Sequence, residues 1–124
     1  MVFVAHSLFN RKKDYILNLL YLESVISMVY TISEIKKISV PIAKEYGVDS
    51  LSLFGSYARG EATSESDVDF FIDKGNIKGL LDFIGFIQDL EEKLKCHVDV
   101  VTTAIEDKKF LEMIKKDSVL LYEK

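Results

Sequence analysis

The stretch from Leu51 to Asp73 constrains the fold of this chain more than any other segment. It begins with a short apolar run and continues through Gly55-Ser56 and a gap of ten residues, 57–66. It ends with Asp67-Val68-Asp69, which leads into a second apolar run. Short apolar runs bounded by turn residues are typical of buried strands. The segment therefore predicts two strands, with acidic residues at the start of the second.

Asp67 and Asp69 stand two positions apart at the start of that second run. Every second side chain of a strand lies on the same face, so the two carboxylates project together, about 6 to 7 Å apart along the backbone. Two like charges about 4 Å apart repel by about 4 kcal/mol at an effective dielectric near 20, and a cation between them offsets that repulsion. Mg²⁺ binds one or two carboxylates together with water and phosphate oxygens. The pair predicts a Mg²⁺ site, although an exposed strand that binds nothing has the same pattern.

Gly55 and Ser56 follow the first strand and precede a short helix expected from Tyr57. Glycine lets a phosphate group approach the backbone closely, serine adds a hydroxyl, and the start of a helix presents unpaired N–H groups. Arg59 adds a planar guanidinium whose donors fit phosphate oxygens. A plain turn with a solvated arginine explains each residue alone. Combined with the two aspartates, these residues indicate a site for nucleotide phosphates.

A third carboxylate lies in the segment 97–102, whose alternation of polar and apolar residues predicts a strand. If this strand lies beside the one that carries Asp67 and Asp69, Asp99 reaches the same ion or an attacking hydroxyl. His97 falls on the same face as Asp99. We interpret His97 as a partly exposed strand residue and not as a ligand, because three carboxylates already satisfy a hard ion with little affinity for imidazole.

These residues together resemble the minimal nucleotidyltransferases, the small branch of the polymerase-beta-like nucleotidyltransferase superfamily. The resemblance spans about residues 31–124 and depends on Gly55-Ser56-Tyr57-Ala58-Arg59-Gly60, the ten-residue gap, Asp67-Val68-Asp69 and Asp99. It implies that Asp67, Asp69 and Asp99 are catalytic and hold two Mg²⁺ ions, with Asp99 also helping to deprotonate the acceptor. It further implies that Gly55 and Ser56 bind the triphosphate of ATP, which Arg59 is expected to steady.

The rest of the chain alternates between helical and strand patterns. Thr31 and Glu34 form a capping-box pattern for a helix that Gly47 ends, and Pro41 inside it predicts a kink or a break. A second helix through about Lys95 is predicted by apolar residues at helical spacing, which we expect to pack in the core. These residues are Leu80, Leu81, Ile84, Ile87, Leu90 and Leu94.

A helix over about 105–116 and a strand over 119–122 complete the predicted order. The expected fold class is α/β, a single small domain with a mixed β-sheet flanked by helices, as in the polymerase-beta-like nucleotidyltransferase fold. We expect this domain to occupy 28–124. Residues 1–27 form an N-terminal extension that is either helical or a translated leader before Met28. Their apolar run lacks a cleavage site, and Glu23 interrupts it before it could span a membrane.

Charge and cysteine content restrict the partners. The net charge is −4, the sequence pI is about 5.2, and no basic stripe is evident, which argues against binding to a long nucleic acid. The single Cys96 cannot form an internal disulfide and suits a reducing cytoplasm. We therefore expect a cytoplasmic protein with no membrane partner, and a homo-oligomer is compatible with the sequence.

The resemblance also implies an acceptor. Small proteins with this motif resemble the antitoxins of HEPN/MNT toxin–antitoxin pairs, which move AMP from ATP onto a tyrosine of the HEPN ribonuclease toxin. About 25 residues follow the catalytic segments, so we expect an acceptor that docks as a folded partner. Two alternatives stay open: a binding antitoxin that masks its toxin without catalysis, and a nucleotidyltransferase that acts on a small hydroxylated molecule.

Overall fold

The computed structural model of the protein describes residues 29–124. The expectations for residues 1–27, a helical extension or a leader, and the start of the domain at Met28 lie outside the described residues. The elements in chain order are α3 (Ile32–Tyr46), β1 (Ser50–Phe54), α4 (Gly55–Arg59), β2 (Val68–Asp73), α5 (Leu80–Leu94), β3 (Val98–Thr102), α6 (Lys108–Asp117) and β4 (Val119–Glu123).

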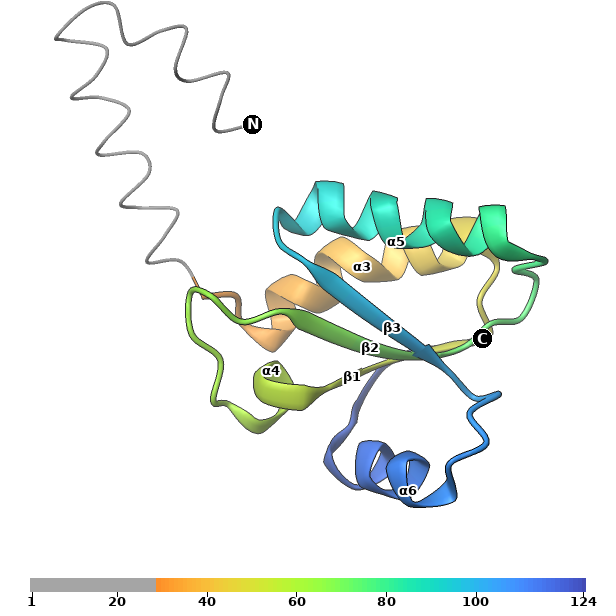
Figure 1. Cartoon of the computed structure of the whole chain (residues 1–124). Coiled ribbons are helices and arrows are strands. Elements are labelled where there is room, and N and C mark those ends of the chain that lie inside the picture. The colour runs from red at the N-terminus through yellow and green to blue at the C-terminus, as the bar shows by residue number, and fades with distance from the viewer. Residues whose placement is uncertain (1–28) are drawn as a thin grey trace, which may run out of the picture.

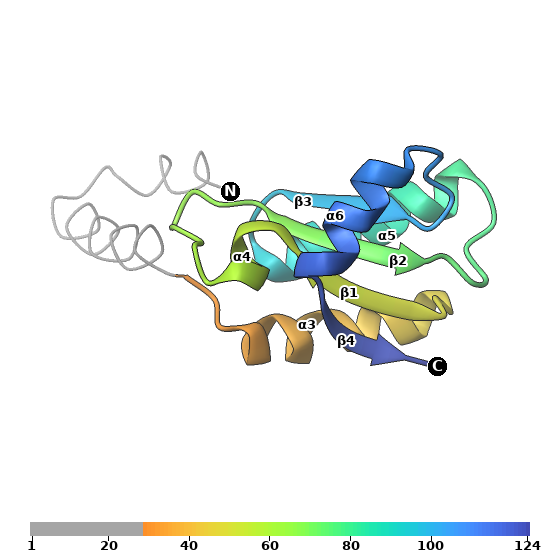
Figure 2. The ribbon, with the colours of Figure 1, turned by 90° about the horizontal axis from the view of Figure 1, so that it is seen from below.

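The four strands form one sheet in the order β3-β2-β1-β4. Strand β1 is antiparallel to both β2 and β4, whereas β2 and β3 are parallel. Helices α3 and α5 lie side by side on one face of the sheet, and α6 lies on the other face (Figures 1 and 2). The predicted fold class, an α/β domain with a mixed sheet flanked by helices, is confirmed. No helix in the described range is long and apolar enough to cross a lipid bilayer.

The main core lies between the sheet and the pair α3 and α5. Alternate strand residues, such as Leu53, Phe70 and Val98, are buried on this face, and each full burial of such a side chain contributes about 1.5 to 3 kcal/mol. Successive side chains of a strand point to opposite faces. Asp69, between the buried Val68 and Phe70, therefore points to the opposite face, where α6 lies.

Helix α3 begins and ends as predicted. Thr31 Oγ1 accepts a hydrogen bond from Glu34 N at 3.0 Å, and Glu34 Oε1 accepts one from Thr31 N at 2.9 Å, which completes the capping box. Gly47 ends the helix with φ +72°. Of the two alternatives predicted at Pro41, a kink or a break, the break is wrong, because the helix continues through Pro41. Pro41 lies on the exposed side and removes one backbone donor, while the next residue, Ile42, is anchored in the core.

The prediction that the apolar row of α5 packs in the core is only partly right, because only part of this row is buried. Leu90 and Leu94 are fully buried, but Leu81 is 86% exposed, and Leu80 and Ile84 are also exposed. Successive helical residues are separated by about 100°, which places Leu81 about opposite the buried row that contains Leu90. The helix has apolar residues over more of its circumference than the sheet covers.

Candidate active site

The pairing of β2 with β3 brings two of the predicted carboxylates together. In this parallel pair Asp69 is the register partner of Asp99. Neighbouring strands lie about 4.8 Å apart, and register partners in a sheet project to the same face. The expectation that the strand of Asp99 lies beside that of Asp69 is confirmed. Asp67 directly precedes β2, and its carboxylate lies within 4.8 Å of a carboxylate oxygen of Asp99.

The pairing of β1 with β2 adds the glycine–serine turn to this group. Phe54 at the end of β1 is the register partner of Asp69, so Gly55 follows directly beside that carboxylate. A Cβ atom on Gly55 would lie 2.2 Å from Asp69 Oδ2, and the residue has φ +76°. Both constraints require glycine at this position. Ser56 follows in the first turn of α4, which begins two residues earlier than expected.

Electrostatics distinguish Asp69 from its neighbours. Burial raises the pKa of Asp69 to about 6, and the carboxylates of Asp99 and, to a smaller extent, Asp67 act in the same direction. The positive charge of Arg59 opposes this shift. The site therefore holds more negative charge than its own residues neutralise. Three carboxylates crowded in this way are an all-oxygen donor set, which fits Mg²⁺.

Arg59 is the last residue of α4 and is partly exposed. Its Nε atom is 3.1 Å from Oε2 of Glu61. Beside it is a hollow of about 160 Å³, with α6 as its second wall. The hollow is lined by Phe54, Gly55, Arg59, Phe110, Met113, Ile114 and Asp117. The sequence gives no sign of this role of α6, because its apolar residues have the spacing of an ordinary core-facing helix.

His97 is exposed, as predicted, but it lies just before strand β3 and in contact with two carboxylates. Its Nε2 atom lies 3.1 Å from Asp99 Oδ1. Its Nδ1 atom lies 3.1 Å from Glu91 Oε2, an oxygen that also accepts a hydrogen bond from Val98 N at 3.1 Å. The contact with Asp99 raises the pKa of His97. The contact of Glu91 with His97 could not be predicted from the sequence, because it depends on the turn that connects α5 to β3.

His97 also belongs to a cluster of ligand atoms that the sequence analysis did not predict. In the part of the chain that the structure describes, one group of at least three His, Cys, Asp or Glu side chains has all its ligand atoms within 4.8 Å of one another. It consists of Asp67, His97 and Asp99. The interpretation of His97 as an exposed residue holds, but it lies in contact with the carboxylates.

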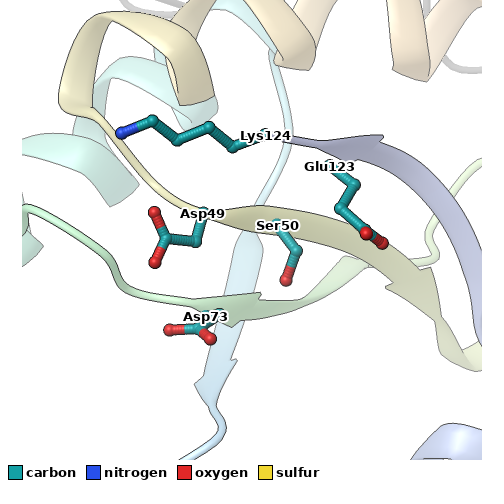
Figure 3. Close-up of a pocket in the computed structure, with 5 residues that line it drawn as sticks. All are labelled: Asp49, Ser50, Asp73, Glu123 and Lys124. Atoms are coloured by element: carbon teal, nitrogen blue, oxygen red, sulfur yellow. The ribbon is translucent and has the colours of Figure 1, made fainter.

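A larger hollow lies at the other end of the sheet. It measures about 480 Å³ and is lined by Asp49, Ser50, Asp73, Glu123 and Lys124. Figure 3 shows the carboxylates of Asp49 and Asp73 on one side of Ser50 and that of Glu123 on the other. Its carboxylates do not converge as those near Asp69 do. We therefore place the candidate active site at the Asp69 end.

Comparisons with known proteins agree with this geometry. The family model of the nucleotidyltransferase domain matches residues 32–122. Protein adenylyltransferase MntA of Thermococcus cleftensis is 43% identical over 75 residues, which cover 57% of this chain and 76% of that protein.

Two solved structures share the fold. A chain of a toxin–antitoxin crystal structure with AMP-PNP superposes with a TM-score of 0.64 at 18% identity, covering 72% of this chain and 73% of that one. A structure of a tri-AMPylated HEPN toxin in complex with MNT antitoxin from Shewanella oneidensis gives 0.57 at 15% identity, covering 73% and 71%. The family model and the Thermococcus relative establish the family. The chain therefore belongs to the nucleotidyltransferase domain family and is a nucleotidyltransferase.

Proposed function

We propose that this nucleotidyltransferase is a Mg²⁺-dependent protein adenylyltransferase that moves AMP from ATP onto a tyrosine of a HEPN toxin and so acts as its antitoxin. The observation that carries the proposal is the register pairing of Asp69 with Asp99 beside Gly55. The similarity to a protein named protein adenylyltransferase MntA supports the choice of AMP and of a protein acceptor. The fold shared with toxin–antitoxin structures is consistent with the partner.

In this proposal the three aspartates have distinct tasks. Asp67, Asp69 and Asp99 would hold two Mg²⁺ ions, which would supply neutralisation of the phosphate charge and a lower pKa of the acceptor hydroxyl. Asp99 is exposed and accepts the proton of the tyrosine hydroxyl as general base. The phenolic oxygen forms a bond to the α-phosphorus, the bond from that phosphorus to the bridging oxygen breaks, and pyrophosphate leaves.

The turn after β1 binds the triphosphate. Gly55 has no side chain, so the turn lies directly against the carboxylate of Asp69 and its backbone stays open to close approach by a phosphate group. Ser56 offers a hydroxyl at the same turn. Arg59 exchanges its contact with Glu61 for a phosphate oxygen, because a guanidinium pairs with phosphate through two parallel hydrogen bonds. The contribution of these residues is mostly the positioning of the reacting groups.

The exposure of the site favours a protein as the acceptor. Asp67 and Asp99 are both exposed, and the hollow beside Gly55 has a volume of about 160 Å³. Small-molecule sites are usually enclosed clefts of about 300 to 1,000 Å³. A folded partner supplies its own surface around the reacting tyrosine and so excludes water without a deep pocket in this chain.

Isotope transfer tests the proposal directly. The purified chain is incubated with Mg²⁺, a HEPN protein, and ATP labelled at either the α- or the γ-phosphate. We expect the α-label on a tyrosine of the HEPN protein and no transfer of the γ-label, which distinguishes adenylylation from phosphorylation. Label that appears only on small molecules would contradict the proposal.

Two variants complete this experiment. Asp67→Ala is expected to abolish transfer, whereas Glu65→Ala, an exposed acid in the same connection, is expected to keep it. Circular dichroism checks that both variants are folded. Full activity of Asp67→Ala would refute the assigned role. Neutralisation of the toxin in cells by Asp67→Ala would instead favour an antitoxin that masks its partner without catalysis.

A further inference from the structure

The proposed reaction leaves one feature of the site unused, the position of His97. Its imidazole lies between two carboxylates, with Nε2 3.1 Å from Asp99 Oδ1 and Nδ1 3.1 Å from Glu91 Oε2. A hard ion such as Mg²⁺ has little affinity for imidazole. His97 therefore adds a different kind of donor to a group that is otherwise all oxygen.

The orientation of the ring matches a second pattern. Histidines that bind metal ions commonly donate the other ring N–H to a carboxylate, which fixes the ring and directs its free nitrogen at the ion. Here Glu91 faces Nδ1, and the same carboxylate oxygen is held by the backbone N–H of Val98 at 3.1 Å. Nε2 is consequently directed at Asp99.

The distances allow a shared ion. One ligand atom from each of Asp67, His97 and Asp99 lies within 4.8 Å of the other two. Ligand atoms of tetrahedral Zn²⁺ lie about 2.0 to 2.2 Å from the ion and hence about 3.4 Å from one another. Nε2 and Asp99 Oδ1 are already this close, and all three side chains are exposed.

We propose that Asp67, His97 and Asp99 form a site for a borderline divalent ion such as Zn²⁺, which competes with Mg²⁺ for the two carboxylates. One imidazole and two carboxylates leave the fourth position of a tetrahedral ion open to water. Zn²⁺ bound here occupies carboxylates that the proposed reaction assigns to Mg²⁺. The consequence is inhibition by Zn²⁺, and only this consequence depends on the proposed function.

Metal titration without nucleotide tests the site itself. Isothermal titration of the full chain with Zn²⁺ alone and with Mg²⁺ alone compares wild type, His97→Ala and His97→Gln. We expect both substitutions to lower Zn²⁺ affinity at least tenfold, in line with the effect of losing a metal ligand or its support. Mg²⁺ affinity is expected to stay within twofold of wild type. Equal Zn²⁺ affinity in wild type and a folded His97→Ala protein would overturn the proposal.

Two controls exclude other zinc ligands. His6→Ala removes the other histidine of the chain, and Cys96→Ser removes the thiol beside His97. Both are expected to keep Zn²⁺ affinity within threefold of wild type. A larger loss in either variant than in His97→Ala would overturn the assignment. Imidazole nitrogen NMR adds a direct measurement, because Zn²⁺ should shift Nε2 of His97 more than Nδ1.

An activity measurement separates this inference from the proposed function. With Mg²⁺ and ATP present, we expect Zn²⁺ to inhibit AMP transfer and His97→Ala to require about tenfold more Zn²⁺ for the same inhibition. Transfer with Mg²⁺ but no His97-dependent Zn²⁺ binding would overturn only this inference. Absence of transfer with His97-dependent Zn²⁺ binding would overturn only the proposed function.

Discussion

Asp69 and Asp73 lie on the same face of the same strand, four residues apart, yet their surroundings differ. Asp69 has Asp99 as its register partner on β3 and Phe54 as its partner on β1, directly before Gly55. Asp73 pairs with Ser50 on β1. It has no register partner on β3, because β3 ends opposite the residue that precedes Asp73. One aspartate is therefore surrounded by other carboxylates and a close turn. The other lies at an open edge (Figure 3).

The difference shows that residue type alone does not make this site. Both ends of β2 carry acidic residues, but only at one end do two strands and a turn direct them at a common point. Burial there, together with the neighbouring carboxylates of Asp99 and Asp67, raises the pKa of Asp69 to about 6. Such crowding is costly without a cation, and a perturbed carboxylate in this position is typical of functional sites. Substitutions at the two ends test this distinction.

The largest effect is expected on catalysis. Asp69→Asn removes a carboxylate from the crowded group, and we expect AMP transfer to fall by about a thousandfold, equivalent to about 4 kcal/mol of transition-state stabilisation. Asp73→Asn makes the same chemical change on the same face and is expected to keep activity within twofold. Initial rates of α-label transfer at saturating ATP provide the comparison. Similar losses in both variants would show that the position on the strand does not matter.

A smaller effect is expected from two glycines, Gly55 at the start of α4 and Gly60 directly after its end. Gly55→Ala forces a Cβ to within 2.2 Å of Asp69 Oδ2 at φ +76°, whereas Gly60 has φ +74° and no atom within 4 Å of the position that a Cβ would occupy. A positive φ costs alanine about 1 to 2 kcal/mol. We expect Gly55→Ala to lose about 3 kcal/mol of unfolding free energy and Gly60→Ala about 1 kcal/mol, because only the first adds a steric clash to the backbone cost. Urea denaturation measures both, and equal losses would show that the turn can move away from Asp69.

The smallest effect concerns stability and pH in the protein without metal ions. The folded state raises the pKa of Asp69 from 3.8 to about 6, so it binds this proton more tightly than the unfolded state. Stability therefore falls as pH rises from about 4 to about 6. Because the side chain is partly exposed, solvent screening limits the loss to about 1 kcal/mol.

Asparagine at position 69 carries no charge and should remove this loss. We expect Asp69→Asn to be about 1 kcal/mol more stable than wild type at pH 7 and equally stable near pH 4, both in excess chelator. Asp73→Asn serves as the control, since Asp73 has no carboxylate partner across β3. Thermal unfolding at a series of pH values gives the comparison. A destabilised Asp69→Asn protein at pH 7 would contradict the assigned crowding.

Several features of the fold could be predicted from local pattern. The capping box of Thr31 and Glu34 and the glycine that ends α3 are confirmed, because capping depends on residues within one turn. The strand that carries Asp69 was also recognisable as a short apolar run, and the strand that carries Asp99 was recognisable from alternation. The rotation of α5 about its own axis could not be predicted, and half of its apolar row is exposed. A row of leucines fixes which residues share a helix face, but not how much of that face the sheet covers.

The amino-acid sequence by itself determined the order of helices and strands, the family and the aspartates that we propose as catalytic, because these follow from short-range spacing. Only the tertiary structure decided that Asp69 pairs with Asp99, that Gly55 lies against Asp69, and that His97 lies between Glu91 and Asp99. These contacts join segments that are distant in sequence or separated by a turn. Their geometry depends on strand register and on the packing of the helix on the sheet, which no local pattern specifies.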